Sequence, residues 1–198
     1  MKDGIKDALI LFAITLIAGI LLGVVYEITK EPIAYQEDLA IVRACSEVFD
    51  EAEIYQEMDE FADDGPTSVV LPMYPGETID DCMEALSEGE ELLGYVITVT
   101  THEGYGGDVT LMLGVTLDGN LNGISILSIS ETAGLGMQAG DVLVPQFRDK
   151  KVSSFVYTKN GATEDNEIDA ISGATITTNA VVNAVNAGMY YFYNGIGR

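Results

Sequence analysis

An uninterrupted apolar segment near the start of the chain constrains its fold more than any other feature. Residues 8–26 read ALILFAITLIAGILLGVVY, a run of 19 residues without a charged side chain. At about 1.5 Å of rise per residue, a helix of this run is roughly 28 Å long, close to the hydrocarbon thickness of a bilayer. We therefore expect residues 1–30 to form a transmembrane anchor, with the span at about 8–26, and residues 31–198 to form a separate domain.

A cleaved signal peptide is the competing interpretation of this segment. Signal peptides have a shorter apolar region and a small-x-small cleavage site, whereas this run ends in the residues VVYE. An uncleaved anchor in the lipid bilayer is therefore favoured. Lys2 and Lys6 precede the span, so the positive-inside rule predicts a cytoplasmic N-terminus. The chain would then be a single-pass protein of the cytoplasmic membrane with its large domain outside the cytoplasm.

The charge of the chain belongs to the part that follows the anchor. Nine Lys and Arg residues face 32 Asp and Glu residues, which gives a formal net charge of −23. Residues 1–30 hold three residues of each sign, so the excess of acids lies in residues 31–198. Nucleic-acid phosphates repel such a surface, and we expect no nucleic-acid partner. An apolar fraction of 47% argues equally against a disordered acidic tail.

The middle of the chain predicts β-structure. Residues 92–100 (LLGYVITVT) and 109–117 (VTLMLGVTL) are rich in β-branched side chains and bounded by glycine. Asp118-Gly119 is a two-residue hairpin signal, and residues 121–129 supply the returning strand. The expected fold class is therefore α+β, with a largely antiparallel sheet in the domain after the anchor.

Weaker patterns complete this prediction. After Thr175 the apolar spacing predicts a long C-terminal helix that Gly195 ends, and Pro32 is expected to break the chain after the anchor. The other elements that we expect are helices over 34–50 and 78–86, short strands over 68–73 and 152–157, and an acidic surface loop over 60–67.

The segment 169–178, with the sequence DAISGATITT, is the strongest candidate for chemistry. Small residues let a ligand approach the backbone, and the helix start that follows offers unpaired N–H groups and the positive end of a dipole. Together these features favour a phosphate site, to which Thr175 or Thr177 adds a hydroxyl. An ordinary helix N-terminus with Ser/Thr capping explains the same residues.

This segment resembles the covalent flavinylation motif of the FMN-binding domain family, in which SGAT is followed by x-Thr-Thr and preceded by Asp. The resemblance implies that an extracytoplasmic flavin transferase joins the phosphate of one FMN per chain to Thr175 through a phosphodiester. The other residues of the motif then divide between a phosphate cradle and recognition by the transferase. The cradle comprises Ser172, Gly173, Ala174 and Thr177, and Asp169 serves recognition.

Two further segments carry the same resemblance. Residues 130–136 (SETAGLG) resemble the family's E-T-P-G-L-G signature, with Ala133 where proline is usual. Residues 104–107 (GYGG) resemble the glycine-rich turn of the family. The resemblance implies that the first of these segments shapes a pocket for the flavin ring. Its contributing residues are Glu131, Thr132, Gly134, Leu135 and Gly136.

The order of anchor, GYGG, hairpin, ETAGLG and SGAT most resembles the G subunits of Rnf electron-transport complexes. That resemblance implies an electron-carrying, non-autonomous subunit of a ferredoxin:NAD oxidoreductase that translocates Na⁺ or H⁺. Its partners would be the other subunits of the complex and the transferase. The alternatives are the related C subunit of sodium-pumping NADH:quinone reductases, a stand-alone extracytoplasmic flavin domain of another reductase, or a non-redox anchored interaction module.

The remaining candidate residues predict no second site. His102 is the one histidine and is expected at a strand end or on the surface, so we expect no metal centre. The acidic pairs at 63–64 and 80–81 lack the spacing of a calcium loop. Cys45 and Cys82 are too few to ligate a cluster, and the sequence leaves open whether they form a disulfide.

Overall fold

The computed structural model describes residues 2–58 and 65–196. The chain divides between Ile41 and Val42 into two compact units. Helix α1 (Lys2–Val48) runs through this division and also through the boundary expected at residues 30 and 31. The apolar run over 8–26 is helical and its side chains are exposed, as a membrane-spanning helix requires.

The expectation that Pro32 breaks the chain is wrong, because Pro32 lies inside α1. A proline removes one backbone hydrogen bond and crowds the preceding turn, at a cost of about 3 kcal/mol. The helical turns on both sides of Pro32 continue regardless. The helix expected over 34–50 is confirmed as the last part of α1, which ends at Val48.

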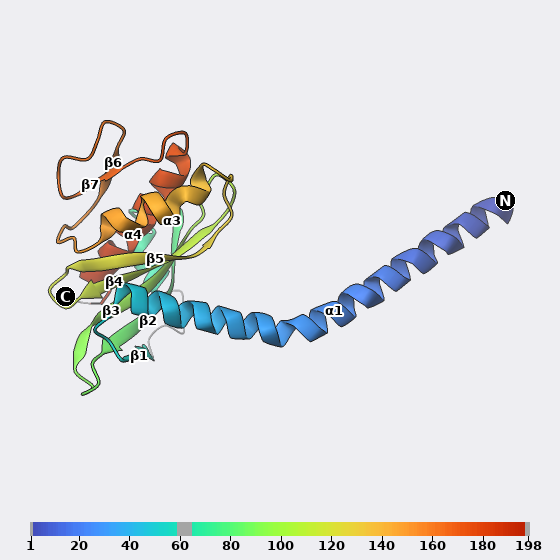
Figure 1. Cartoon of the computed structure of the whole chain (residues 1–198), viewed down its shortest axis with the longest axis horizontal. Coiled ribbons are helices and arrows are strands. Elements are labelled where there is room, and N and C mark those ends of the chain that lie inside the picture. Colours follow the sequence, from blue (N-terminus) through green and yellow to red (C-terminus); the bar gives the residue numbers. More distant parts are fainter. Residues whose placement is uncertain (1, 59–64, 197–198) are drawn as a thin grey trace. The chain divides into compact units, whose positions relative to one another are not determined.

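Five antiparallel strands form the main sheet among the described residues, in the order β1-β2-β3-β4-β5 (Figure 1). The hairpin expected at Asp118-Gly119 is present, since β4 pairs with β5, but its loop has three residues rather than two because the Thr116 N–H donates to the Asn120 carbonyl. Strand β3 pairs with β4 along its length. The strands are β1 (Ile54–Glu57), β2 (Glu77–Leu86), β3 (Leu92–Thr101), β4 (Val109–Thr116) and β5 (Leu121–Ile129).

Two predictions before β3 are wrong. The helix expected over 78–86 is strand β2, which pairs with β1 on one side and β3 on the other. A register shift between Ile79 and Asp81 interrupts the two-residue period, so the sequence pattern resembles that of a helix. The strand expected over 68–73 is instead the end of helix α2 (Gly65–Val70) and a turn. Of the acidic loop expected over 60–67, residues 60–64 lie outside the described residues and the rest begins α2.

The C-terminal helix α4 (Thr175–Asn194) covers one face of the sheet and builds the larger core. Alternate residues of β3 and β4, such as Ile97 and Leu113, are fully buried together with Val185 and Met189 of α4. Gly195 follows the last turn of α4, as expected. The start of α4 is therefore held at one edge of the sheet.

The end of α1 packs on the opposite face of the sheet. Cys45 and Phe49 are buried there against Met83 and Val96. Cys82, which lies on the same strand as Met83, belongs to the α4 side. The two cysteines are not bonded to each other in this structure, because they belong to the cores on opposite faces of the sheet.

Short elements join β5 to α4. They include a parallel strand pair, in which Val156 lies opposite Glu167. The strand expected over 152–157 is confirmed only at its end, in β6. These elements are η2 (Gly136–Gln138), α3 (Ala139–Val142), η3 (Val144–Phe147), β6 (Val156–Thr158) and β7 (Glu167–Asp169).

A buried carboxyl group lies at the start of β2. Glu77 is only 1% exposed, and its Oε1 accepts a hydrogen bond of 3.1 Å from the Thr101 hydroxyl. Its Oε2 has no hydrogen-bond partner within the described structure. Burial raises the pKa of Glu77 from 4.5 to about 8, with a smaller contribution from the charge of Glu103.

Glu77 therefore predicts a loss of stability as the pH rises. The folded chain retains the proton up to about pH 8, whereas the unfolded chain loses it near pH 4.5, so the stabilisation is complete below pH 4.5 and disappears by pH 8. Relative to Glu77→Gln, we expect the free energy of unfolding of the wild type to fall by up to about 5 kcal/mol across this range. Urea titrations of the full chain in detergent at pH 5 to 8 measure this difference in the free energy of unfolding. Parallel curves for the two proteins would contradict the assignment, and Glu84→Gln is the control on the same strand.

Candidate functional site

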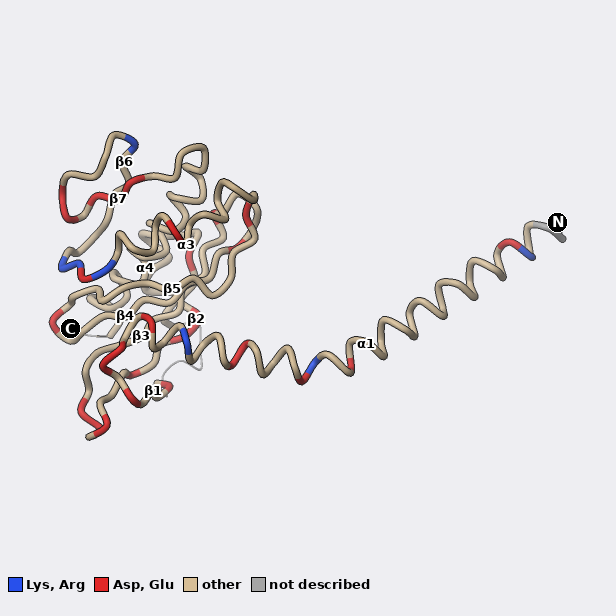
Figure 2. The backbone as a smooth tube through the Cα atoms, in the orientation of Figure 1, with Lys and Arg blue, Asp and Glu red and all other residues tan. Residues whose placement is uncertain are grey.

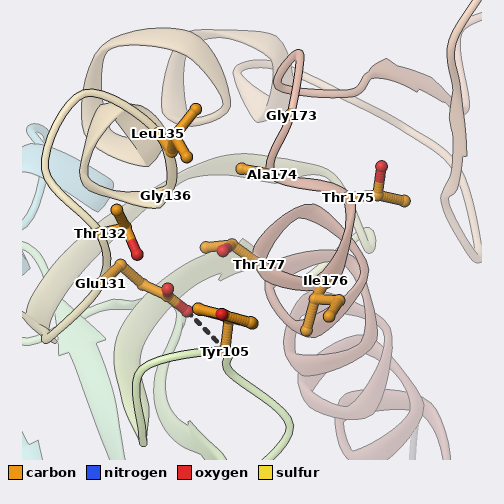
Figure 3. Close-up of a pocket in the computed structure, with 10 residues that line it drawn as sticks. All are labelled: Tyr105, Glu131, Thr132, Leu135, Gly136, Gly173, Ala174, Thr175, Ile176 and Thr177. Carbon is orange, nitrogen blue, oxygen red and sulfur yellow. Dashed lines mark hydrogen bonds between the residues drawn. The ribbon is translucent and has the colours of Figure 1, made fainter.

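A cavity of about 460 Å³ lies at the start of α4. Three loops that are distant in sequence meet there, namely the loop before β4, the loop after β5 and the loop before α4 (Figure 3). The residues that line the cavity are Tyr105, Glu131, Thr132, Leu135, Gly136, Gly173, Ala174, Thr175, Ile176 and Thr177.

The loop before α4 turns sharply at Gly173. Its φ of +79° lies in the left-handed region, which a residue with a Cβ adopts only with strain. Ala174 then occupies the N-cap position of α4, and no side chain caps the helix. The first-turn amides therefore have no side-chain acceptor, and Thr175 and Thr177 of this turn line the cavity. An anion at this position would supply the missing acceptor.

Thr178 fixes the shape of this loop through two hydrogen bonds. Its side chain is fully buried, and its Oγ1 accepts a hydrogen bond of 3.1 Å from the Ile171 N–H and donates one of 2.9 Å to the Ala174 carbonyl. One hydroxyl thus joins both ends of the turn to the first turn of α4. The sequence motif contains Thr178, but residue type alone does not reveal that its hydroxyl is the internal clamp.

The loop after β5 and the loop before β4 are joined by Glu131. Its Oε1 accepts a hydrogen bond of 2.7 Å from the Tyr105 N–H. Gly136 packs so closely that a Cβ there would lie 2.7 Å from Thr177 Oγ1 and 2.8 Å from the Cβ of Glu131. Only glycine at this position lets the loop after β5 approach α4.

Eight residues that the sequence resemblance implied for the site line the cavity, and three do not. Ser172 is exposed beside it, and Gly134, with a φ of +76°, forms the turn between Thr132 and Leu135. Asp169 lies farther along the approach to the loop. The Asp169 carboxylate accepts a hydrogen bond from the Ala162 N–H, and Gln146 bonds both the N–H and the carbonyl of Asp169.

Two lining residues are additional to those that the sequence implied. Tyr105 is 69% exposed and Ile176 is 53% exposed, so each presents an apolar surface at the mouth of the cavity. The GYGG pattern drew attention to the loop of Tyr105, but its approach to Glu131 is a long-range contact. In the sequence, Ile176 is recognisable only as an apolar helix residue.

The geometry fits a planar ligand with an anionic group. The cavity has an apolar mouth, uncapped amides and a partly buried hydroxyl on Thr175. None of the lining residues is basic, so an anion there is held by backbone amides and hydroxyls rather than by an ion pair. Groups of three or more His, Cys, Asp or Glu that could hold a metal ion are absent among the described residues.

Comparison with known proteins gives two family matches. The FMN-binding domain model matches residues 104–189, and the model of the RnfG N-terminal region matches residues 1–48. Over 191 residues the chain is 30% identical to the G subunit of the Na⁺-translocating ferredoxin:NAD⁺ oxidoreductase complex of Acetobacterium woodii, covering 96% of this chain and 91% of that one. Over 188 residues it is 32% identical to the G subunit of the proton-translocating ferredoxin:NAD⁺ oxidoreductase complex of Clostridium ljungdahlii. This alignment covers 91% of this chain and 90% of that one.

A solved structure shares the fold. The crystal structure of the C subunit of the Na⁺-translocating NADH-quinone reductase from Parabacteroides distasonis superposes with a TM-score of 0.53 at 18% identity. It covers 74% of this chain and 79% of that chain. The two proteins therefore share a fold.

The Thr178 clamp predicts a specific pair of mutant phenotypes. Thr178→Val keeps the shape and removes both hydrogen bonds, so we expect a loss of about 1–3 kcal/mol in the free energy of unfolding. Thr178→Ser keeps the hydroxyl and should retain most of that stability. Urea titration of the two variants measures the difference, and a larger loss for Thr178→Ser than for Thr178→Val would show that the methyl group rather than the hydroxyl is important.

Proposed function

This chain belongs to the family of G subunits of Rnf-type ion-translocating oxidoreductase complexes, and on that premise we propose that it carries one FMN covalently attached to Thr175. It is an FMN-binding, electron-transferring subunit anchored to a membrane, and its partners are the other subunits of the complex. The finer proposal is that a phosphodiester joins the FMN phosphate to the Thr175 hydroxyl. The bound flavin supplies the redox chemistry, which is one-electron transfer in our proposal.

The observation that carries the proposal is the position of Thr175. The side chain of Thr175 is half-buried and lines the cavity. The residue is the first of a 20-residue helix that has no side-chain cap. A phosphodiester on Thr175 retains negative charge, which the first-turn amides stabilise. Thr177 is 1% exposed and lines the same cavity, so its hydroxyl would contribute to the phosphate cradle with Gly173 and Ala174.

The rest of the cavity would hold the flavin ring. Leu135, Tyr105 and Ile176 supply apolar surface, while Glu131 and Thr132 supply polar groups. The exposed position of Ser172 and the exposed turn at Gly134 are compatible with contacts to an incoming enzyme as much as to the flavin. We propose that Asp169 serves recognition by a flavin transferase, although its carboxylate also stabilises the loop at Ala162.

Attachment requires an activated flavin donor. The Thr175 oxygen forms a bond to the FMN phosphorus, its proton is released, and a leaving group departs from that phosphorus. A flavin dinucleotide supplies such a group, because its pyrophosphate bond breaks as the new bond forms. A partner enzyme therefore has to reach Thr175, and the exposed mouth of the cavity supports this access.

We further propose that the N-terminus is cytoplasmic and that the domain following the anchor lies outside the cytoplasm, within a complex that couples electron transfer between ferredoxin and NAD to Na⁺ or H⁺ movement. The lysines that precede the span support this orientation. The match of residues 1–48 to the RnfG N-terminal region favours this role over a C-type subunit or an isolated flavin domain.

The attachment site is tested by paired threonine variants of the full chain, co-expressed with a flavin transferase. The wild type and Thr163→Val, a variant of an exposed threonine outside the cavity, should give a flavin-fluorescent band in a denaturing gel, whereas Thr175→Val should fold and give none. Thermal unfolding of each variant serves as the folding control. A fluorescent Thr175→Val band, or a dark wild type, would refute the covalent assignment.

The orientation is tested with reporters fused after the C-terminal helix. Alkaline phosphatase folds to an active form only outside the cytoplasm, so we expect its fusion to be active and the matching fusion to a cytoplasm-dependent fluorescent protein to be dark. Replacing Lys2 and Lys6 by Gln should increase the inverted fraction. A bright fluorescent fusion with an inactive phosphatase fusion would place the domain in the cytoplasm.

A further inference from the structure

The cavity contains a single charged side chain, and that side chain is acidic. Glu131 lies just after β5, and the other lining residues are uncharged. The basic residues of the domain gather elsewhere, around the segment from η3 to β6 (Figure 2). There Lys150 pairs with Asp165 and Lys151 pairs with Asp118. The charge of Glu131 is therefore not neutralised by a lining residue.

The Glu131 carboxylate is held in place by its surroundings. Its Oε1 accepts the 2.7 Å hydrogen bond from the Tyr105 N–H, and the side-chain stem packs against Gly136. In Figure 3 the side chain extends from the loop after β5 toward Tyr105 and Thr177. A carboxylate fixed by a backbone amide cannot rotate freely into solvent, so its charge stays at the cavity.

We propose that Glu131 sets the redox potential of the site by keeping a negative charge beside the bound flavin. This inference rests on the proposed function and adds a role beyond shaping the pocket. An electron that enters a flavin adds negative charge, and a fixed carboxylate disfavours that charge more strongly in a partly desolvated cavity than in water. No basic lining residue offsets this effect. Glu131 therefore lowers the midpoint potential.

The same residue also joins two loops, so charge and hydrogen bonding have to be separated. Glu131→Gln retains an oxygen that accepts the Tyr105 N–H and removes the charge. Glu131→Asp retains the charge and shortens the side chain by one methylene, which disrupts the hydrogen bond. If charge sets the potential, the Gln variant has the higher potential of the two. If the loop junction sets it, the Asp variant deviates more from the wild type.

The experiment is a spectroelectrochemical titration of the full chain carrying covalent flavin, in detergent. We expect Glu131→Gln to raise the one-electron midpoint potential by at least about 59 mV, which is a tenfold change in the equilibrium. Glu91→Gln removes one charge at the β2–β3 turn, at the opposite end of β3 from the cavity, and is the matched control. A Glu131→Gln potential equal to that of the wild type and the control overturns the proposal.

A second pair of variants leaves Glu131 unchanged. Thr132 is exposed and lines the cavity, so Thr132→Glu adds a second carboxylate there and Thr132→Gln adds an uncharged side chain of similar size. We expect the potential of the Glu variant to lie below that of the Gln variant, and equal potentials contradict the inference even if Glu131→Gln does not fold. Wild-type protein without covalent flavin would refute the proposed function itself, which is a distinguishable failure.

Discussion

The packing of α4 against one face of the five-stranded sheet is the interaction on which the rest of the domain depends. It buries a continuous stripe of the helix, including Val181, Val185 and Met189, on alternate residues of β3 and β4. Because the helix is anchored along its length, its first turn is held at the sheet edge where the loops before β4 and after β5 emerge. A cavity between three loops is thus positioned by a core, and the loops themselves require little regular structure.

The domain leaves some polar groups without internal partners. The start of α4 has no side-chain cap, and buried Glu77 has an oxygen without a hydrogen-bond partner in the described structure. Such groups usually cost stability, and they are common at functional sites. In our account the uncapped amides are satisfied by the phosphate that Thr175 carries, while Glu131 provides the electrostatic environment of the flavin ring. Stability comes mainly from the hydrophobic core between α4 and the sheet, whereas ligand binding is assigned to the cavity at the start of α4.

Local sequence patterns predicted the elements whose neighbours are close in sequence. Strands β3 to β5 follow from β-branched runs, the β4–β5 turn follows from Asp118-Gly119 although it is one residue longer than expected, and α4 follows from its apolar spacing. Strand β2 was missed because a register shift obscures its alternation and because its pairing with β1 is not visible locally. In the site, the motif segments identified most lining residues through resemblance. Tyr105 and Ile176, and the clamp by Thr178, depend on contacts between distant loops or on hydrogen bonds that residue type does not specify.

The central claim is that this chain holds its flavin through a covalent bond at the start of α4. Tandem mass spectrometry of the full chain, purified after co-expression with a flavin transferase and digested, tests it most directly. Our account predicts that the peptide containing residues 169–178 gains the mass of one FMN less one water and that fragmentation assigns the addition to Thr175. A peptide of unmodified mass, or an addition that fragments to Thr177 or Ser172, would contradict it.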